Sequence, residues 1–349
     1  MRKRYASSTD VARRAGVSQS TVSRTFRGDI HVSNEVRARV EAAAEELGYR
    51  PNLLPRIMLT QQSKIVALVF GGLHNPFYSR VLEHFTERLQ EIGCQVMLCH
   101  VDSDDALDAV VPRLSGYRVD AVVSALSVMT EAASRQLTDL GVPVISFNTH
   151  LRRKGLYTIS CDNVLAGRQV ARHLIEQGAS RLGYMGGPTN NPANADRCRG
   201  FAEEAQKQGF NPVISNDEFS FAGGARQALR VFASENPPDG VFCGDDLIAM
   251  GAIDALWKTP TLHAPATLRI VGFDDIPQAT WAPYDLSTMR QDEENMVACA
   301  ISILENLYSD VPMPESGEFP VLGELVVRSS SASGLLLPPL TGGINSRRN

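Results

Sequence analysis

From residue 65 onward the chain alternates short, apolar, β-branched runs with amphipathic helical patterns. The first four runs are IVALVF (65–70), CQVMLCH (94–100), DAVVSA (120–125) and VPVISF (142–147). A second series follows with RLGYMGG (181–187), PDGVFCGDD (238–246) and LRIVGFDD (268–275). This alternation is typical of βαβ units around a buried parallel sheet. It predicts two doubly wound α/β halves that bind a ligand at their strand ends, where polar and glycine-containing loops lie.

The N-terminal segment has a net charge opposite to that of the remainder. Residues 1–64 contain 12 Lys/Arg and 6 Asp/Glu, a net charge of +6. The whole chain carries −5, so residues 65–349 carry −11. A basic head on an acidic body indicates that the head binds a polyanion and that the body has another task.

Three short helices are predicted in the head, over residues 8–15, 18–26 and 33–47. Ser18 and Ser33 are good N-caps, and Gly48 stops the third helix. Gly16 lies between the first two helices, as in the turn of a helix-turn-helix, whose second helix enters the major groove. A plain helical hairpin is the alternative. The apolar residues expected to close the small core of the head are Val22, Phe26, Val36, Val40, Ala43 and Leu47.

Side chains on the second predicted helix suit contact with DNA. Short Ser, Gln and Thr side chains near its start let the backbone approach phosphates and base edges, and the Arg24 guanidinium has the fork geometry that matches guanine.

Several other classes of protein find no support in the sequence. No apolar run reaches about 18 residues, and the N-terminus lacks the apolar core of a signal peptide, so we expect a cytoplasmic protein without a membrane span. The six cysteines form no CxxC pair, which favours reduced, buried thiols. The seven histidines are scattered. Because HExxH, GxSxG and GxGxxG are all missing, we expect no enzyme activity, no metal site and no cofactor.

The segment DVARRAGVSQSTVSRTFRG…VSNEVRARVEAAAEELGYRPN closely resembles the N-terminal domain of the LacI/GalR family of bacterial transcriptional regulators. The body is similar to the same family in NPFYSRVLE (75–83), DNVLAGRQVARHLIEQG (162–178), RCRGF (197–201), CGDDLIAMGA (243–252), VGFDDI (271–276) and ELVVRSS (324–330). The resemblance covers about residues 8–335. It implies a DNA-binding head, a hinge and a two-lobed body like that of periplasmic sugar-binding proteins.

The resemblance also implies which residues of the head contact DNA. Gln19, Ser20 and Arg24 stand at the base-reading positions. Met58 stands where a hinge residue wedges into the minor groove, although packing in a dimer is the alternative. The positions expected to hold phosphates or the backbone are Ser18, Thr21, Ser23, Ser33 and Tyr49.

In the body, the resemblance places the ligand between the lobes. Aromatic rings would stack on a sugar or planar ring, while Asp, Asn and Arg would take hydroxyls or an anionic group. Three alternatives stay open: an ion pair between Arg197 and Asp274, a helix cap by Asn75, which we expect more than ligand binding, and a cap by Asp246 on the helix that follows. The implied ligand-binding residues are His74, Phe77, Tyr78, Asn148, Arg197, Phe219, Asp245 and Asp274.

The expected organisation is a head (1–50), a hinge (51–64), an N-terminal lobe (65–161 and 291–320), a C-terminal lobe (162–290 and 321–332) and a loose tail (333–349). The chain is expected to cross between lobes near residues 161–162, 289–291 and 320–321. The predicted function is that of a homodimeric repressor of carbohydrate-use genes. Its partners are a pseudo-palindromic operator and a small effector: a sugar, sugar acid or phosphosugar, acting as inducer. An activator, a corepressor-dependent regulator and a sugar sensor without DNA binding are the alternatives.

Overall fold

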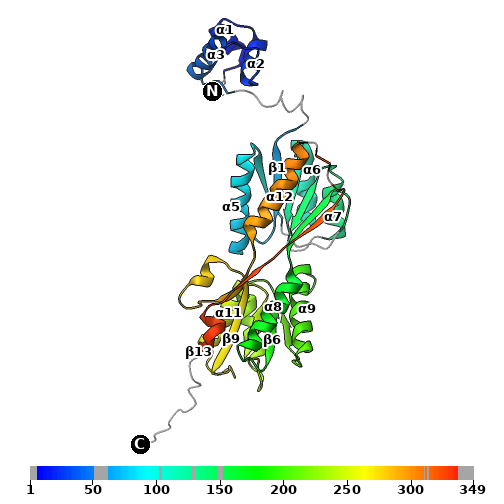
Figure 1. Ribbon diagram of the computed structural model, residues 1–349, viewed down its shortest axis with the longest axis vertical. Helices are drawn as coiled ribbons and strands as arrows, with labels where there is room; N and C mark the ends of the chain where they lie inside the picture. Colours follow the sequence, from blue (N-terminus) through cyan, green and yellow to red (C-terminus); the bar gives the residue numbers. More distant parts are fainter. Residues whose placement is uncertain are drawn as a thin grey trace, which may run out of the picture. The chain divides into compact units, whose positions relative to one another are not determined.

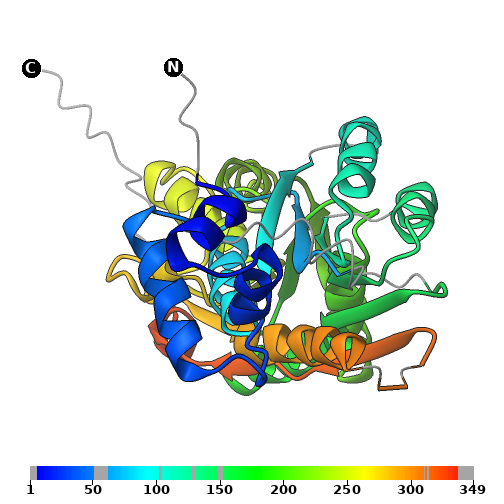
Figure 2. The same cartoon turned by 90° about the horizontal axis from the view of Figure 1, so that it is seen from above.

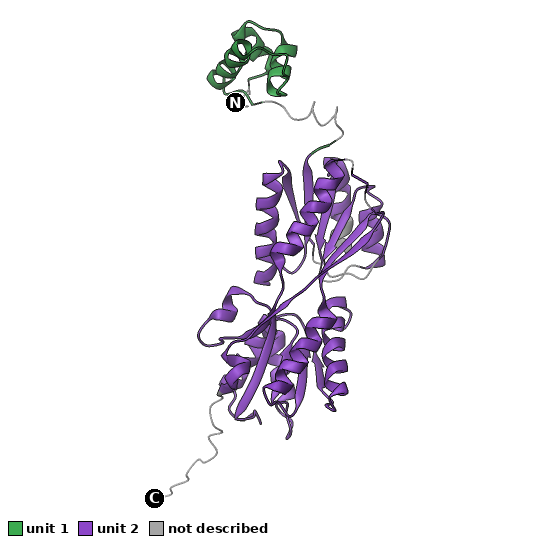
Figure 3. Cartoon of the chain, in the orientation of Figure 1, with its two compact units in different colours: residues 1–63 green, residues 64–349 purple. Residues whose placement is uncertain are grey.

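The computed structural model describes residues 6–50, 62–101, 104–126, 130–147, 152–309, 311–312 and 314–336. The chain divides into two compact units, residues 1–63 and 64–349 (Figure 3). Residues 51–61 of the expected hinge, with Met58, lie outside the described residues, as does Asn148.

The described residues of the first unit form three helices, α1 (Ser8–Ala15), α2 (Gln19–Phe26) and α3 (Asn34–Glu46). Ser18 and Ser33 cap α2 and α3, because their side chains accept hydrogen bonds from the backbone N–H three residues on. Ser7 caps α1 in a reciprocal capping box with Asp10. Gly16 adopts a φ of 67°, a left-handed conformation that glycine reaches without strain, and this turns the chain between α1 and α2.

The core of the head differs in two places from the expected stripe. Phe26 and Leu47 are more than a third exposed. Thr25 and Ala44 take inward positions instead. The buried apolar residues of this cluster are Val11, Ala12, Ala15, Val22, Val40, Ala43 and Ala44.

The N-terminal lobe of the second unit is a six-stranded parallel sheet in the order β11-β5-β4-β3-β1-β2. Its strands are β1 (Ile65–Phe70), β2 (Gln95–His100), β3 (Ala121–Ala125), β4 (Val144–Phe147), β5 (Leu156–Cys161) and β11 (Gly317–Val321). The first four of these are the predicted apolar runs. Helices cover both faces, as the near-continuous apolar strands require: α5 (Pro76–Glu91), α6 (Asp104–Tyr117), α7 (Glu131–Thr138) and α12 (Glu293–Tyr308).

Two hydrophobic clusters occupy the two faces of this sheet. One contains Phe77 and Phe85 of α5 together with Ile301 and Leu304 of α12. The other contains residues of α6 and α7, such as Leu137. Figure 2 accordingly shows α12 on the opposite side of the lobe from α6 and α7.

The C-terminal lobe is a second sheet, with the path β12-β10-β9-β8-β6-β7 and β13 paired to β9. Only the pairings of β12 with β10 and of β13 with β9 are antiparallel. The strands are β6 (Leu182–Gly186), β7 (Val213–Asn216), β8 (Gly240–Cys243), β9 (Thr267–Asp274), β10 (Ser287–Arg290), β12 (Glu324–Val326) and β13 (Leu335–Leu336). The helices are α8 (Asn163–Glu176), α9 (Pro192–Lys207), α10 (Phe221–Val231), α11 (Asp246–Lys258), η1 (Pro277–Thr280) and η2 (Ser330–Gly334).

The expectation of a loose tail from residue 333 is wrong for its first four residues. The turn of η2 continues to Gly334, and Leu335 pairs with Leu268 as β13 joins the sheet. Burial of Leu335 against the hydrophobic cluster of the lobe explains this order. Residues 337–349 lie outside the described residues.

The chain passes between the two sheets three times, at residues 161–163, 290–293 and 321–324 (Figure 1). These segments lie side by side. A Cβ on Gly323 would lie 3.0 Å from the Arg290 carbonyl oxygen and 3.2 Å from Cys161 Sγ. Three adjacent connections therefore join the two lobes at one place.

Candidate functional site: an inter-lobe cavity and a helix-turn-helix surface

A cavity lies between the lobes, at the carboxyl ends of parallel strands. Seven of the eight predicted ligand-binding residues line it, from positions as distant as His74 and Asp274, and Asn148 lies outside the described residues. This is the location at which doubly wound sheets bind ligands. The described lining is Gly72, His74, Asn75, Phe77, Tyr78, Leu126, Asn191, Ala193, Arg197, Phe219, Asp245, Asp274 and Gln291.

Asp274 connects the two lobes at this cavity. Its Oδ2 accepts a hydrogen bond from Asn75 Nδ2 at 2.9 Å, and its Oδ1 accepts one from Gln291 Nε2 at 2.7 Å. Asn75 belongs to the N-terminal lobe, and its Oδ1 caps α5 by accepting from Phe77 N at 2.9 Å, as expected. One asparagine therefore fixes both the start of a helix and a bond across the cavity.

A second polar contact joins the lobes beside a group of aromatic rings. His74 Nε2 and the Phe219 carbonyl oxygen are 3.1 Å apart. The rings of Phe77 and Tyr78 meet edge to face with centroids 5.3 Å apart. Burial raises the pKa of Tyr78 to about 12, so its hydroxyl stays protonated at neutral pH. Tyr78 therefore contributes an aromatic ring and a neutral hydroxyl to this side of the cavity.

Arg197 does not form the predicted alternative pair with Asp274. Its Nε donates to Asn163 Oδ1 at 2.8 Å, and its Nη1 donates to the Gly244 carbonyl oxygen at 2.6 Å. The guanidinium also stacks on Phe273, 3.4 Å from the ring centroid. The side chain is 4% exposed, so these contacts hold a buried charge rigidly at the cavity wall.

The helix cap at the start of α11 is Asp245, whereas the sequence suggested Asp246. Asp245 Oδ1 accepts from Ile248 N at 2.7 Å. Asp246 points elsewhere, because its carboxylate accepts from the Thr288 hydroxyl at 2.7 Å and from Ile276 N at 2.9 Å. The Asp246 side chain therefore binds the loop after β9 and does not cap the N-terminus of α11.

Asp245 is a buried carboxyl in an unfavourable environment. Burial, and then the negative charge of Asp274, raise its pKa to about 7, against the opposing effects of the Ile248 N–H and of Arg197. An acid whose pKa is higher in the folded state than in the unfolded state loses its contribution to stability as pH rises through the folded value.

We therefore expect the melting temperature to fall as the pH rises from 5.5 to 8.5. In Asp245→Asn the fall is expected to be smaller, and at pH 8 this variant should melt above the wild type, because asparagine retains the helix cap without the charge. Calorimetric melting across this pH range measures both effects. Asp254→Asn, on the outer part of α11, is the matched control; an equal change in this control would contradict the assignment to Asp245.

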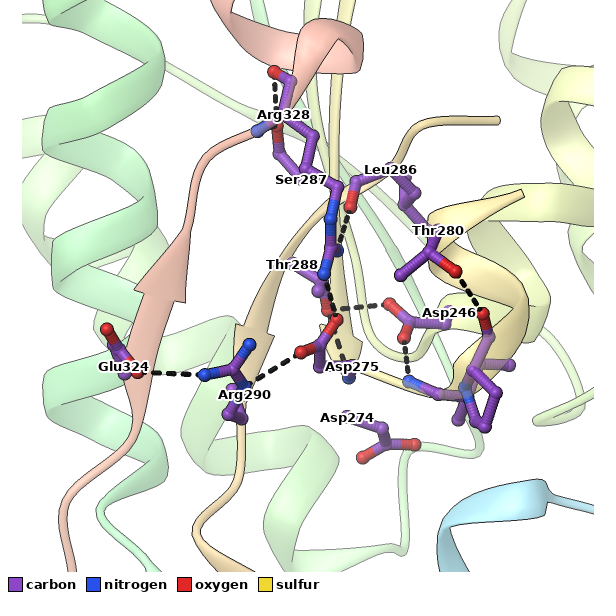
Figure 4. A network of polar contacts seen from close by, with 12 residues as sticks. Asp246, Asp274, Asp275, Thr280, Leu286, Ser287, Thr288, Arg290, Glu324 and Arg328 are labelled. Atoms are coloured by element: carbon purple, nitrogen blue, oxygen red, sulfur yellow. Dashed lines mark hydrogen bonds and ion pairs between the residues drawn. The ribbon is translucent and has the colours of Figure 1, made fainter. Parts of the chain in front are cut away.

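Asp275, the residue after Asp274, connects the cavity to the segments that cross between the lobes (Figure 4). Asp275 Oδ2 accepts from Arg290 Nε at 2.8 Å, and its Oδ1 accepts from Arg328 Nη2 at 2.7 Å. Arg290 Nη1 in turn lies 3.2 Å from Glu324 Oε2. Asp274 and Asp275 have φ values of 110° and 56°, which are unusual for residues with side chains. This strained pair joins the cavity to two of the three crossings.

Sequence reasoning missed five residues of the cavity wall: Gly72, Leu126, Asn191, Ala193 and Gln291. Gln291 had a usable signal, since it lies in a predicted crossing between lobes. The other four are small or apolar residues, or a helix cap in the case of Asn191, and nothing in their local pattern distinguishes them from structural residues.

In the head, the predicted DNA-contacting residues lie in or beside α2 and α3. Ser18 Oγ lies 2.7 Å from Ser20 Oγ and 2.8 Å from Thr21 Oγ1. Gln19 Nε2 donates to Ser8 Oγ at 2.9 Å. Arg24 Nε donates to Asp29 Oδ2 at 2.8 Å, with about half of its side chain exposed.

The other predicted residues of the head have structural contacts. Arg27 Nη2 donates to Ser23 Oγ at 2.9 Å, and Ser33 caps α3. Tyr49 packs on Phe26 with ring centroids 5.7 Å apart. Phe26, which lies outside the buried core, therefore contacts the ring of Tyr49.

Three further observations apply to the described parts of the chain. No helix there is long and apolar enough to cross a membrane. No group of three or more His, Cys, Asp or Glu side chains there is arranged to hold a metal ion. All six cysteines are free; four are buried as expected, whereas Cys198 and Cys299 are half-buried.

A head of helix-turn-helix type and a two-lobed body with an inter-lobe cavity define the class of ligand-binding DNA-binding regulators. The family described as bacterial regulatory proteins, lacI family, matches residues 9–52, and a periplasmic binding protein-like domain matches residues 171–331.

Known proteins are similar over nearly the whole chain. The chain is 30% identical over 301 residues to the HTH-type transcriptional repressor PurR of Proteus mirabilis, covering 84% of this chain and 88% of that protein. It is 28% identical over 305 residues to the ribose operon repressor of Escherichia coli K12, covering 86% and 92%. The crystal structure of the Lac repressor dimer bound to operator and the anti-inducer ONPF has the same fold, with a TM-score of 0.82 at 22% identity over 94% of this chain and 99% of that one.

The chain belongs to the LacI family of bacterial regulatory proteins. It is a DNA-binding transcriptional regulator with a ligand-binding body, and the named relatives are repressors rather than enzymes.

Proposed function

We propose that this protein is a homodimeric repressor of carbohydrate-use genes that a small sugar-like inducer releases from its operator. The observation that carries the proposal is the inter-lobe cavity, in which polar side chains and aromatic rings from both lobes converge. Aromatic faces suit the apolar face of a sugar ring, and fixed polar groups suit its hydroxyls. The relatives named above include a ribose operon repressor.

The proposed ligand-binding residues are those predicted from the sequence. His74, Phe77 and Tyr78 belong to the N-terminal lobe, and the C-terminal lobe contributes Arg197, Phe219, Asp245 and Asp274. Asn148 remains a proposal outside the described residues. A ligand that contacts both groups stabilises one relative placement of the lobes and so shifts the equilibrium between placements.

A two-fold symmetric dimer presents two heads, so the proposed operator is a pseudo-palindrome. In each head Gln19, Ser20 and Arg24 are proposed to read bases. Met58 is proposed to wedge into the minor groove. The residues proposed to hold the DNA backbone are Ser18, Thr21, Ser23, Ser33 and Tyr49.

The test is a gel-shift titration with the full chain on an operator enriched from random DNA, with and without each sugar of a panel. Ligand coupling of this kind is typically about 1–3 kcal/mol, or ~5- to 150-fold in operator affinity. An inducer lowers the affinity. A sugar that raises it would replace the inducer by a corepressor, and a panel without effect on either ligand binding or operator affinity would contradict the proposal.

Arg24→Ala is expected to weaken binding to the selected operator by ~5- to 150-fold and binding to random DNA much less. A bidentate contact with guanine accounts for about 1–3 kcal/mol of discrimination. Asp29 holds Arg24 Nε at 2.8 Å, which limits the conformations of the guanidinium before binding. Gel shifts on both DNAs measure the ratio.

Arg27→Ala is the matched control, because it removes the same charge about one helical turn further along. We expect its effect to be similar on both DNAs, as for a contact with phosphate. Equal losses on operator and random DNA for Arg24→Ala would show that Arg24 contacts phosphate and not a base.

A further inference from the structure

Two buried oxygen atoms at the cavity have no hydrogen-bond partner. They are Oδ2 of Asp245 and Oε1 of Gln291. Both residues line the cavity, and their side chains are almost fully buried, with 2% and 1% exposure. A buried acceptor without a partner is unfavourable. Each of these atoms therefore suits a hydrogen-bond donor that a ligand brings.

The neighbouring carboxylate is already satisfied. Asp274 accepts from Asn75 through Oδ2 and from Gln291 through Oδ1. The amide nitrogen of Gln291 is thereby directed to Asp274, which leaves its Oε1 as an acceptor. Asp245 and Asp274 together place two carboxyl groups at the C-terminal side of the cavity.

Arg197 does not provide a free pair of guanidinium nitrogens that could bind an anion beside these two carboxyl groups. A guanidinium binds a phosphate or carboxylate best through two nitrogens of one edge. Nε and Nη1 of Arg197 already donate to Asn163 and to the Gly244 carbonyl. Each edge of the guanidinium thus includes a nitrogen that is in use. Among the described residues that line the cavity, Arg197 is the one lysine or arginine.

We propose that the cavity selects an uncharged, polyhydroxylated effector that donates hydrogen bonds to Asp245 and Gln291, and that Asp245 excludes phosphorylated and acidic sugars. This rests on the proposed function and narrows its ligand class. Each hydroxyl of a sugar donates one hydrogen bond, so two hydroxyls of one effector satisfy the carboxylate oxygen of Asp245 and the amide oxygen of Gln291. Above pH 7, where Asp245 is mostly ionised, a phosphate or carboxylate at the same place brings acceptors and negative charge against it.

The test uses matched pairs of sugars that differ by one anionic group. Full-length protein is melted with D-ribose and D-ribose 5-phosphate, D-glucose and D-glucose 6-phosphate, and D-glucose and D-glucuronate, each at the same concentration and pH 8. At least one neutral member is expected to raise the melting temperature by about 2 °C or more, and its anionic partner by much less. Titration calorimetry on the responding pair then measures both affinities.

The outcomes separate this inference from the proposed function. Equal or stronger binding of an anionic member overturns the selection for uncharged effectors, while the sugar-responsive repressor stands. If no member of any pair binds, both the inference and the sugar-like effector are overturned.

Asp245→Asn tests the residue itself. Asparagine keeps the cap on α11 and removes the charge, so we expect affinity for the neutral sugar to fall about 10-fold and the preference over its anionic partner to fall about as much. Asp245→Ser, also a capping residue, provides a second variant if the first does not fold. Asp254→Asn, a carboxylate of the same helix that pairs with Lys258, is expected to retain both values. Full preference in both Asp245 variants would overturn the role of Asp245.

Discussion

Gly251→Ala is expected to lower the free energy of unfolding by about 3 kcal/mol. A Cβ at this position of α11 would lie 1.9 Å from the Phe221 carbonyl oxygen and 3.1 Å from Ala225 N, both in the backbone of α10. Backbone atoms cannot move aside as a flexible side chain can, so the two helices must separate. Urea denaturation of the full chain measures the loss.

The chain offers a matched control for this change. Gly116 lies in α6, and a Cβ there would meet nothing within 4 Å. Gly116→Ala is expected to leave stability unchanged or to raise it by up to about 1 kcal/mol, because alanine favours helix. Equal denaturation midpoints for the two variants would contradict the role of close helix contact.

Close approach of helices also positions the cavity residues. A Cβ on Gly224 of α10 would lie 2.1 Å from the Ile248 carbonyl oxygen, and one on Gly200 of α9 would lie 2.0 Å from the Val164 carbonyl oxygen. α11 begins directly after Asp245, and α9 contains Arg197. Gly224 therefore determines how closely α10 packs on the helix that follows Asp245, and Gly200 determines how closely α8 packs on the helix that contains Arg197.

Asp274→Ala is expected to weaken binding of the responding neutral sugar by about 30-fold or more. The change leaves the amide groups of Asn75 and Gln291 without their acceptor, and truncation of one partner in a buried, charge-assisted contact typically costs about 2–5 kcal/mol. The lobes also lose a bond that joins them. Titration calorimetry measures the affinity, and gel shifts measure whether the operator complex still responds to the sugar.

Asp239→Ala is the control for loss of a hydrogen-bonded carboxylate. Asp239 accepts from Ser180 and Arg181 within the C-terminal lobe, away from the cavity lining. We expect this variant to lose stability but to bind the sugar with wild-type affinity. Wild-type sugar affinity in Asp274→Ala would contradict the role of Asp274 as a bond between lobes.

The local features of the head were predictable because their causes lie within a few residues. Ser18 and Ser33 each cap a helix through a backbone N–H three residues on, and Gly16 turns the chain by its own φ. The apolar runs that became β1, β3 and β4 were equally clear, because strands buried on both faces are apolar throughout. The run that became β2 was also apolar, although β2 is a partly exposed edge strand. Strand β7 was missed, because its residues VISN are exposed or half-buried and short.

The cavity was predictable only in outline. Motif positions and the rule that ligands bind at strand ends brought seven named residues to one place. Their individual partners were not predictable. Asp246 does not cap the helix because its carboxylate accepts a hydrogen bond from Thr288 instead. Thr288 lies 42 residues away in the chain, so no local sequence pattern reveals this contact.

The sequence by itself determined the three helices of the head, the alternation of strands and helices in the body, the opposite charges of head and body, and the family, since these follow from local periodicity, capping, composition and motif spacing. Tertiary structure alone decided that the two Asp274 oxygens accept from Asn75 and Gln291, that Arg197 donates to Asn163, and that one oxygen of Asp245 has no hydrogen-bond partner. The physical reason is that hydrogen-bond satisfaction in a buried site depends on groups brought together from distant parts of the chain. Composition and spacing define which groups are present, but packing decides which of them remain for a ligand.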